Sequence, residues 1–310
     1  MEHGASNITD AKLPLPSLTL VEVGGGSFSV DEGSACACEA SCSASDSASG
    51  EIAFLTDAAL DRAVGVRLAF SIRSGGTSAA PYESLNLGRF VGDDPLAVER
   101  NMQMLLAAAG MDGLYDTLVN PVQVHGTRVV DIESTPASPR FDDECDAVAT
   151  ELPHVPVMLC YADCVPVVLV SPTGRFSVVH SGWKGTYGGI SGKALRYLCA
   201  ASGADPSQVN VYIGPHIGQC CYEVDAELAS RFAERFGTEC VDVRNHLDLE
   251  LCVMDSLLEA GANRSRIASA STCTACNTNR FYSHRAEGGA TGRFCALCCR
   301  MQTGREVQPR

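Results

Sequence analysis

Residues 157–183 read VMLCYADCVPVVLVSPTGRFSVVHSGW, and this stretch decides the fold. It holds three largely apolar runs, at 157–161, 165–170 and 176–180. Short runs of this kind, rich in β-branched residues and without polar alternation, predict strands of a sheet that is covered on both faces. Asp163 and Cys164 interrupt the apolar pattern between the first two runs.

Four helices are predicted around these strands. Asp94 and Pro95 supply an N-cap and a first-turn residue, and apolar residues then recur on one helical face as far as Ala109. Glycines end the other three, which are predicted at 190–201, 225–236 and 248–260. Further strands are predicted at 118–124, 128–132, 209–213 and 267–270. Strands mixed with helices predict one compact α/β (α+β) domain.

Composition and charge bound the class of protein. The chain has 310 residues with 45% hydrophobic content, enough for a large core. Its 23 basic and 37 acidic residues give a net charge of −14, which argues against nucleic acid or an anionic membrane as a partner. Without a basic, apolar leader or a membrane-length apolar run, we expect a cytoplasmic protein.

The chain is expected to divide at residue 50. Residues 1–50 are rich in Gly, Ser and Ala and predict a flexible N-terminal extension, whose deletion should leave folding intact. Residues 51–310 are predicted to form the single catalytic domain. Most of the 16 cysteines are expected to be reduced and packed as small hydrophobic residues.

Three residues combine into a candidate metal centre. His125, Cys164 and His180 each stand where the chain bends at the end of an apolar run, next to small residues. Two imidazoles and one thiolate leave the fourth tetrahedral position open, as in catalytic zinc sites. The alternative is that the histidines bond to backbone and Cys164 is only packing, because spacing in sequence proves no proximity.

The motifs of the chain, taken together, closely resemble the laccase-domain family, which is also labelled polyphenol oxidoreductase, peptidoglycan editing factor or purine nucleoside phosphorylase. The similarity runs in order from about residue 66 to residue 297. The motifs that carry it are Arg73–Ser78, Pro81–Gly88, Val91–Asp94, Gln123–Gly126, Ala162–Cys164, His180–Gly185, Ile213–Ile217, Cys221–Val224 and Cys273–Thr274.

This resemblance implies a layered α-β-β-α sandwich and a zinc site whose ligands fall on His125, Cys164 and His180. It also implies phosphorolysis of adenosine, inosine and methylthioadenosine, with adenosine deamination as a further activity. Residues 1–63 have no counterpart in the family pattern.

Phosphorolysis requires an anion pocket. The candidate residues are Arg73, Lys184, Arg285 and Arg293, and Arg73 is preferred because it stands between a strand end and a Gly-Gly turn. Each could instead be a surface charge or part of an internal ion pair. For deamination, a metal-activated water would attack the purine while Asp163 carries protons or, alternatively, only orients a ligand.

Two other activities fit the same residues. A copper-dependent polyphenol oxidase could use two histidines and a cysteine, and copper would bind such a site in vitro. Seven histidines without a His-x-His pair are, however, too few for a multicopper cluster. A cysteine hydrolase acting on peptidoglycan precursors would use Cys164 as nucleophile and a histidine as base. A scaffold without enzymatic activity is a further alternative.

Four cysteines raise the question of a second metal. Cys273, Cys276, Cys295 and Cys298 make two C-x2-C pairs, a spacing typical of structural zinc. The alternative is that the second pair belongs to an ordinary strand.

Overall fold

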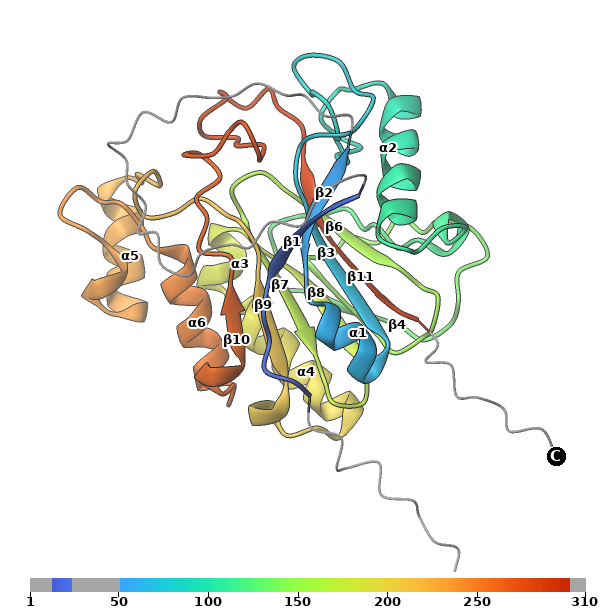
Figure 1. The fold of residues 1–310 in the computed structure, drawn as a ribbon. Coiled ribbons are helices and arrows are strands. Elements are labelled where there is room, and N and C mark those ends of the chain that lie inside the picture. The colour runs from blue at the N-terminus through green and yellow to red at the C-terminus, as the bar shows by residue number, and fades with distance from the viewer. Residues whose placement is uncertain (1–12, 24–50, 302–310) are drawn as a thin grey trace, which may run out of the picture.

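The computed structural model describes residues 13–23 and 51–301. Two β-sheets pack face to face in this part of the chain, and helices cover their outer faces (Figure 1). The layered α-β-β-α architecture that the family resemblance implies is therefore confirmed.

The first sheet has five strands and is antiparallel throughout. In spatial order they are β1 (Thr19–Val23), β2 (Ile52–Thr56), β3 (Val66–Ser71), β11 (Phe294–Arg300) and β6 (Val157–Tyr161).

The second sheet has six strands, with parallel pairs at its two edges and antiparallel pairs between them. In spatial order they are β10 (Ile267–Ser269), β9 (Asn210–Ile213), β7 (Val165–Val170), β8 (Phe176–Ser181), β5 (Ala147–Thr150) and β4 (Val129–Ile132).

Helices form the outer layers. α2 (Pro95–Ala108) packs its buried residues on the first sheet, and α4 (Ile190–Ser202) and α6 (Leu249–Glu259) pack on the second. Asp94 accepts the amide of Leu96 at the start of α2, as its N-cap position predicts. The remaining helices are α1 (Ala58–Val64), α3 (Trp183–Tyr187) and α5 (Ala226–Phe236), with short 3-10 turns at Tyr115–Thr117, Pro206–Gln208, Thr238–Cys240 and Arg264–Arg266.

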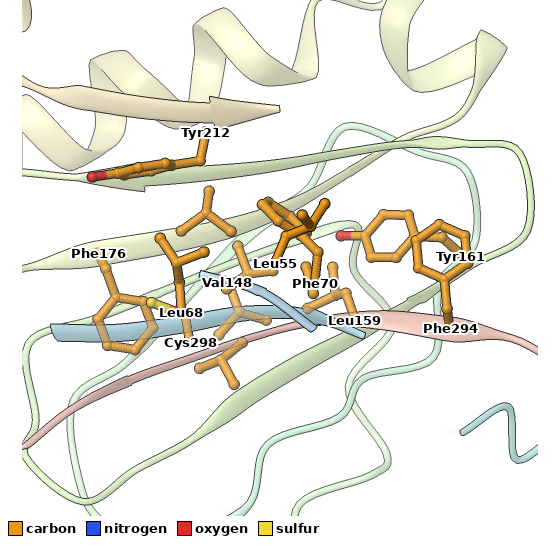
Figure 2. Close-up of a cluster of buried hydrophobic side chains, with 14 of the residues drawn as sticks. Leu55, Leu68, Phe70, Val148, Leu159, Tyr161, Phe176, Tyr212, Phe294 and Cys298 are labelled. Carbon is orange, nitrogen blue, oxygen red and sulfur yellow. The ribbon is translucent and has the colours of Figure 1, made fainter. Parts of the chain in front are cut away.

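The main core lies between the two sheets (Figure 2). Successive side chains of each strand point alternately to the two faces of its sheet. Val168 of β7 faces this central layer, whereas Val167 and Leu169 face the helices. β11 alternates in the same way. This explains why the central strands read as unbroken apolar runs.

One predicted strand is absent from the described residues. Residues 118–124 form only isolated bridges, at Val119 and Val122. Pro121 lacks an amide hydrogen, so it cannot donate to a regular ladder. Of the described helices, none combines the length and the apolarity needed to cross a membrane.

The N-terminal segment differs from the flexible extension expected over residues 1–50. β1 pairs with β2 along its whole length, and Leu13 is buried in the central layer. The side-chain amide of Asn210 donates to the carbonyl of Pro14. Residues 13–23 are therefore part of the packed domain, because the backbone of β1 pairs with β2 and Leu13 packs into the core. Residues 1–12 and 24–50 lie outside the described residues.

Leu13→Ala should destabilise the protein by about 2–4 kcal/mol, because the truncation leaves a cavity at a buried site. Leu13 is 4% exposed, whereas Leu15, two residues further on, is 63% exposed. Leu15→Ala is the matched control and should change stability by less than about 0.5 kcal/mol. Urea unfolding measures both variants, and equal stabilities would contradict the packing of this segment.

Candidate active site

His125, Cys164 and His180 form one cluster at the end of the second sheet. Their ligand atoms all lie within 4.8 Å of one another. The Cys164 Sγ is 3.9 Å from the His125 Nε2, and the two imidazole centroids are 4.8 Å apart. His180 is the penultimate residue of β8, Cys164 lies in the turn between β6 and β7, and His125 lies in the loop before β4. The fold thus brings together residues from three separate segments.

A buried carboxylate that the sequence analysis missed organises this cluster. Asp146 is 0% exposed, and its Oδ1 lies 2.8 Å from the His180 Nδ1. The same carboxylate accepts the amides of His125 at 2.9 Å and Gly126 at 2.6 Å. Because the Nδ1 of His180 carries the donated hydrogen, its Nε2 is available as a ligand.

A signal for Asp146 is present in the sequence. It directly precedes the apolar run Ala147–Val148–Ala149, where a charged side chain is costly unless it is hydrogen-bonded. Which groups satisfy it could not be read from the sequence, since His180 is 34 residues away.

The cluster favours a thiolate. Burial raises the pKa of Cys164, but the charge of His180 and hydrogen bonds from both histidines outweigh it and lower the pKa to about 6. Burial lowers the pKa of His180, but the Cys164 thiolate and Asp146 raise it to about 9. The thiolate form is the one that binds a metal ion.

Gly182 makes room for the cluster. A Cβ at this position would lie 2.7 Å from the His125 Cδ2 and 3.0 Å from the Cys164 Sγ. Only glycine allows this close approach of backbone to the ligands. His125 itself adopts a positive φ of 58°, which aims its imidazole back toward Cys164.

The cluster lines a cavity of about 510 Å³. This volume lies in the range of small-molecule sites. The cavity wall combines aromatic and basic side chains. They are Phe90, Tyr161, Trp183, Tyr222, Arg89, His284, Arg285 and Arg293.

Two of the four predicted anion-binding residues line this cavity. Arg285 and Arg293 are in its wall, and Arg285 stacks over the Tyr222 ring at 5.1 Å. Arg293 is hydrogen-bonded to the carbonyls of its own loop. Burial lowers its pKa, although nearby Cys164 and Asp163 oppose this effect.

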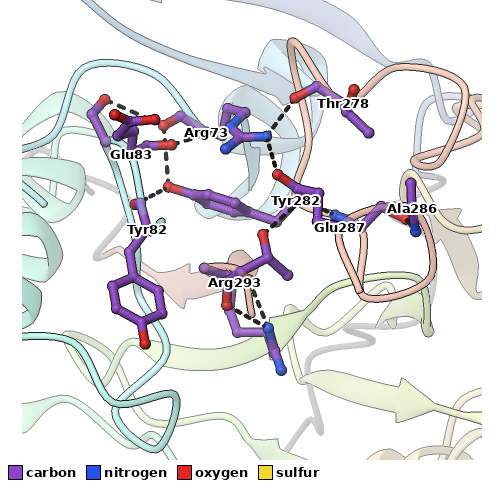
Figure 3. A network of polar contacts seen from close by, with 12 residues as sticks. Arg73, Tyr82, Glu83, Thr278, Tyr282, Ala286, Glu287 and Arg293 are labelled. Atoms are coloured by element: carbon purple, nitrogen blue, oxygen red, sulfur yellow. Dashed lines mark hydrogen bonds and ion pairs between the residues drawn. The ribbon is translucent and has the colours of Figure 1, made fainter. Parts of the chain in front are cut away.

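Arg73 and Lys184 do not line the cavity. Arg73 pairs with Glu287 at 2.9 Å, donates to the carbonyl of Thr278 and lies over the Tyr282 ring (Figure 3). Its preference as the phosphate ligand is therefore not supported, because Glu287 already neutralises its charge. The Lys184 ammonium lies 5.4 Å from the Trp183 ring centroid.

Asp163 lies at the cavity wall, but both of its carboxylate oxygens are engaged. Oδ1 accepts the Thr274 hydroxyl at 2.6 Å and Oδ2 accepts the Arg285 amide at 2.7 Å. Its backbone has a positive φ of 88°. This arrangement positions two loops of the cavity wall, and it leaves neither oxygen without a donor.

The fold and the cluster define a two-sheet α/β protein with a candidate His-His-Cys metal centre in the lining of a cavity. The chain belongs to the family described as multi-copper polyphenol oxidoreductase laccase, whose model matches residues 67–301.

Relatives of this chain carry enzyme names. It is 33% identical to the purine nucleoside phosphorylase YlmD of Geobacillus stearothermophilus, over 74% of this chain and 88% of the relative. It is 36% identical to a purine nucleoside phosphorylase of Deinococcus radiodurans, over 74% and 87%. Adenosine deaminase RL5, from an unknown prokaryotic organism, is 33% identical over 68% and 85%.

Solved structures share the fold. The hypothetical protein YfiH of Bacillus licheniformis superposes with a TM-score of 0.72 and 28% identity, covering 80% of this chain and 96% of that one. YlmD from Geobacillus stearothermophilus superposes with a TM-score of 0.68 and 30% identity, covering 77% and 93%.

Asp146→Asn should weaken zinc binding about 10- to 100-fold, because an amide nitrogen would face the donors that the carboxylate now accepts. The affinity is measured by competition with a chromophoric chelator at fixed pH. Asp142→Asn is the control, since Asp142 is exposed and outside the cluster. Equal zinc affinities for the two variants would show that Asp146 does not orient His180.

Proposed function

We propose that this protein is a zinc-dependent purine nucleoside phosphorylase. It would act on adenosine, inosine and methylthioadenosine with phosphate, releasing the free base and the sugar 1-phosphate, and would deaminate adenosine as a second activity. The observation that carries the proposal is the His125, Cys164 and His180 cluster, which lines a cavity together with two arginines. Relatives named purine nucleoside phosphorylase, and one named adenosine deaminase, support it.

The residues present fit zinc. Two imidazoles and one thiolate are nitrogen and sulfur ligands of the kind that zinc binds, and the lowered pKa of Cys164 supplies the thiolate. Asp146 accepts at the Nδ1 of His180 and leaves its Nε2 for the ion, which must displace the proton that the raised pKa of His180 retains. Zinc held by these residues would supply a Lewis acid facing the cavity.

Arg285 and Arg293 would hold the phosphate. In phosphorolysis a phosphate oxygen bonds to the anomeric carbon while the glycosidic C–N bond breaks, and its electron pair leaves with the purine, which takes up a proton. The cationic guanidinium groups neutralise phosphate and orient its oxygens. Asp163 fixes the Arg285 backbone, so we propose that it acts as a positioning residue.

The purine would bind against the aromatic wall. Tyr222, Trp183 and the exposed Phe90 line the cavity and offer flat apolar faces of the kind on which bases stack. Cys164 must remain reduced in order to act as a thiolate ligand. The cytoplasm is a reducing compartment, so a cytoplasmic location is part of this proposal.

Two alternative activities have specific support. The family description favours a copper-dependent polyphenol oxidase. The close Cys164 and His180 pair, with pKa values of about 6 and 9, favours a cysteine hydrolase acting on peptidoglycan precursors. Chelator treatment separates them: it should abolish phosphorolysis, and zinc should restore it. If copper restores only phenol oxidation, the protein is a polyphenol oxidase and our proposal is wrong. If hydrolysis of peptidoglycan precursors resists the chelator, the cysteine hydrolase is the better assignment.

Cys164→Ala should lose zinc from this centre and lower phosphorolysis of inosine at least about 100-fold, because the site loses its only anionic ligand. Cys199→Ala is the matched control, since Cys199 is buried on α4 and away from the cavity. Cys160 is unsuitable because it lines the cavity. Zinc content and ribose 1-phosphate release measure both variants, and similar turnover would refute the centre.

Arg293→Gln should raise the KM for phosphate about 10- to 100-fold, the effect of losing one charge-assisted hydrogen bond. The KM for inosine should change far less, because the substitution leaves the aromatic wall intact. Arg196→Gln, on the exposed face of α4, is the control. A phosphate KM equal to that of the control would remove Arg293 from the anion site.

A further inference from the structure

Four cysteines form a second cluster in the described part of the chain. The Sγ atoms of Cys220, Cys221, Cys273 and Cys276 all lie within 4.8 Å of one another. The Cys276 Sγ is 3.6 Å from that of Cys220 and 3.4 Å from that of Cys221. The four share no residue with the His-His-Cys cluster.

Backbone hydrogen bonds hold the two halves of this four-cysteine cluster together. His216 and Cys273 form a parallel bridge, in which the His216 amide donates to Thr272 and the Thr274 amide donates to His216. The amides of Cys221 and Tyr222 both donate to the carbonyl of Gly218. Two tight turns, one from each segment, therefore present their cysteines to the same point.

One backbone donor already points at a sulfur. The Gly218 amide lies 3.3 Å from the Cys273 Sγ. An N–H group aimed at sulfur favours the thiolate over the thiol. Such contacts are typical of the groups that surround metal-bound cysteines.

The cluster differs from the two C-x2-C pairs suggested by the sequence. Cys273 and Cys276 take part, but Cys295 and Cys298 lie on β11. Cys295 faces the α2 layer and Cys298 faces the central layer, because an odd spacing puts strand residues on opposite faces. The adjacent pair Cys220 and Cys221 takes their place.

We propose that Cys220, Cys221, Cys273 and Cys276 bind a structural zinc ion. Four sulfurs at about 2.3 Å from a tetrahedral ion are about 3.8 Å apart. The Cys276 Sγ lies 3.6 and 3.4 Å from two of its partners, and all four sulfurs lie within 4.8 Å of one another. Four thiolates exclude the hard cations and select zinc or iron. The site is closed, with no position left for a substrate.

The ion would brace the cavity wall. Thr274, next to Cys273, donates to Asp163, and the Arg285 side chain donates to the carbonyl of Cys221. Tyr222 follows Cys221 and lines the cavity. The proposed zinc thus joins the two turns that position Asp163, Arg285 and Tyr222, and it does so whether or not the protein is a phosphorylase.

Metal content in a Cys164→Ala background tests this proposal separately from the proposed function, since that background removes the first centre. The full chain, loaded with zinc and desalted, should retain about one zinc per chain. Adding Cys273→Ala and Cys276→Ala should remove it. Adding Cys295→Ala and Cys298→Ala is the matched control and should leave it in place. The proposal is overturned if the zinc is retained after Cys273→Ala and Cys276→Ala, or if it is lost only after Cys295→Ala and Cys298→Ala.

Cobalt substitution covers the case in which the cysteine variants fail to fold. Cobalt bound to the Cys164→Ala protein should show the intense sulfur-to-metal charge-transfer and visible bands of a tetrahedral tetrathiolate site. Absence of these bands overturns the assignment. Iron in the purified protein would also overturn it. A disulfide-linked peptide that joins Cys276 to Cys220 or Cys221, found in protein alkylated before digestion, would do the same.

Discussion

The hydrogen bond between the buried Asp146 carboxylate and the His180 imidazole is the interaction on which the candidate centre depends. Burying a charged carboxylate costs folding free energy unless hydrogen-bond donors surround it, and Asp146 is fully buried. Burial raises the pKa of Asp146, but the bond from His180 and the amides of Gly126 and His125 lower it overall. The carboxylate therefore stays charged and fixes the two histidines of the cluster from one point.

Tyr161 connects this arrangement to the hydrophobic core between the two sheets. Tyr161 ends β6, and its hydroxyl donates to the carbonyl of Val179 on the opposite sheet. Its ring lies 5.4 Å from the His180 imidazole and 5.8 Å from the Phe294 ring. The two sheets thus meet beside Tyr161 and His180, which both line the cavity. Close packing there leaves His180 little freedom to leave the cluster.

The sequence predicted the elements whose pattern is local. The runs at 157–161, 165–170 and 176–180 are strands, and the capped helices at 95–109 and 190–201 are present with small shifts at their ends. Other elements were missed because their pattern is ambiguous. β5 is only four residues long, and β1 lies beside a Gly/Ser-rich segment that dominates its composition.

The sequence analysis named the three residues of the cluster but not the contacts that support them. His125 and Cys164 lie in turns and His180 lies one residue before the end of β8, and the family resemblance pointed to all three. The pairing of Arg73 with Glu287 joins residues 214 positions apart, and only the fold brings them together. The same holds for the four-cysteine cluster, in which β11 alternation removes Cys295 and Cys298.

The two clusters also differ in the charge that they would give a bound zinc ion. Two neutral imidazoles and one thiolate leave a net charge of about +1, which retains the ability to polarise a ligand in the open position. Four thiolates give about −2, and they occupy every position. The first donor set lines the cavity, whereas the four cysteines of the second are not among the residues that line it. The distribution of histidine and cysteine therefore separates a site suited to chemistry from a site suited to holding loops in place.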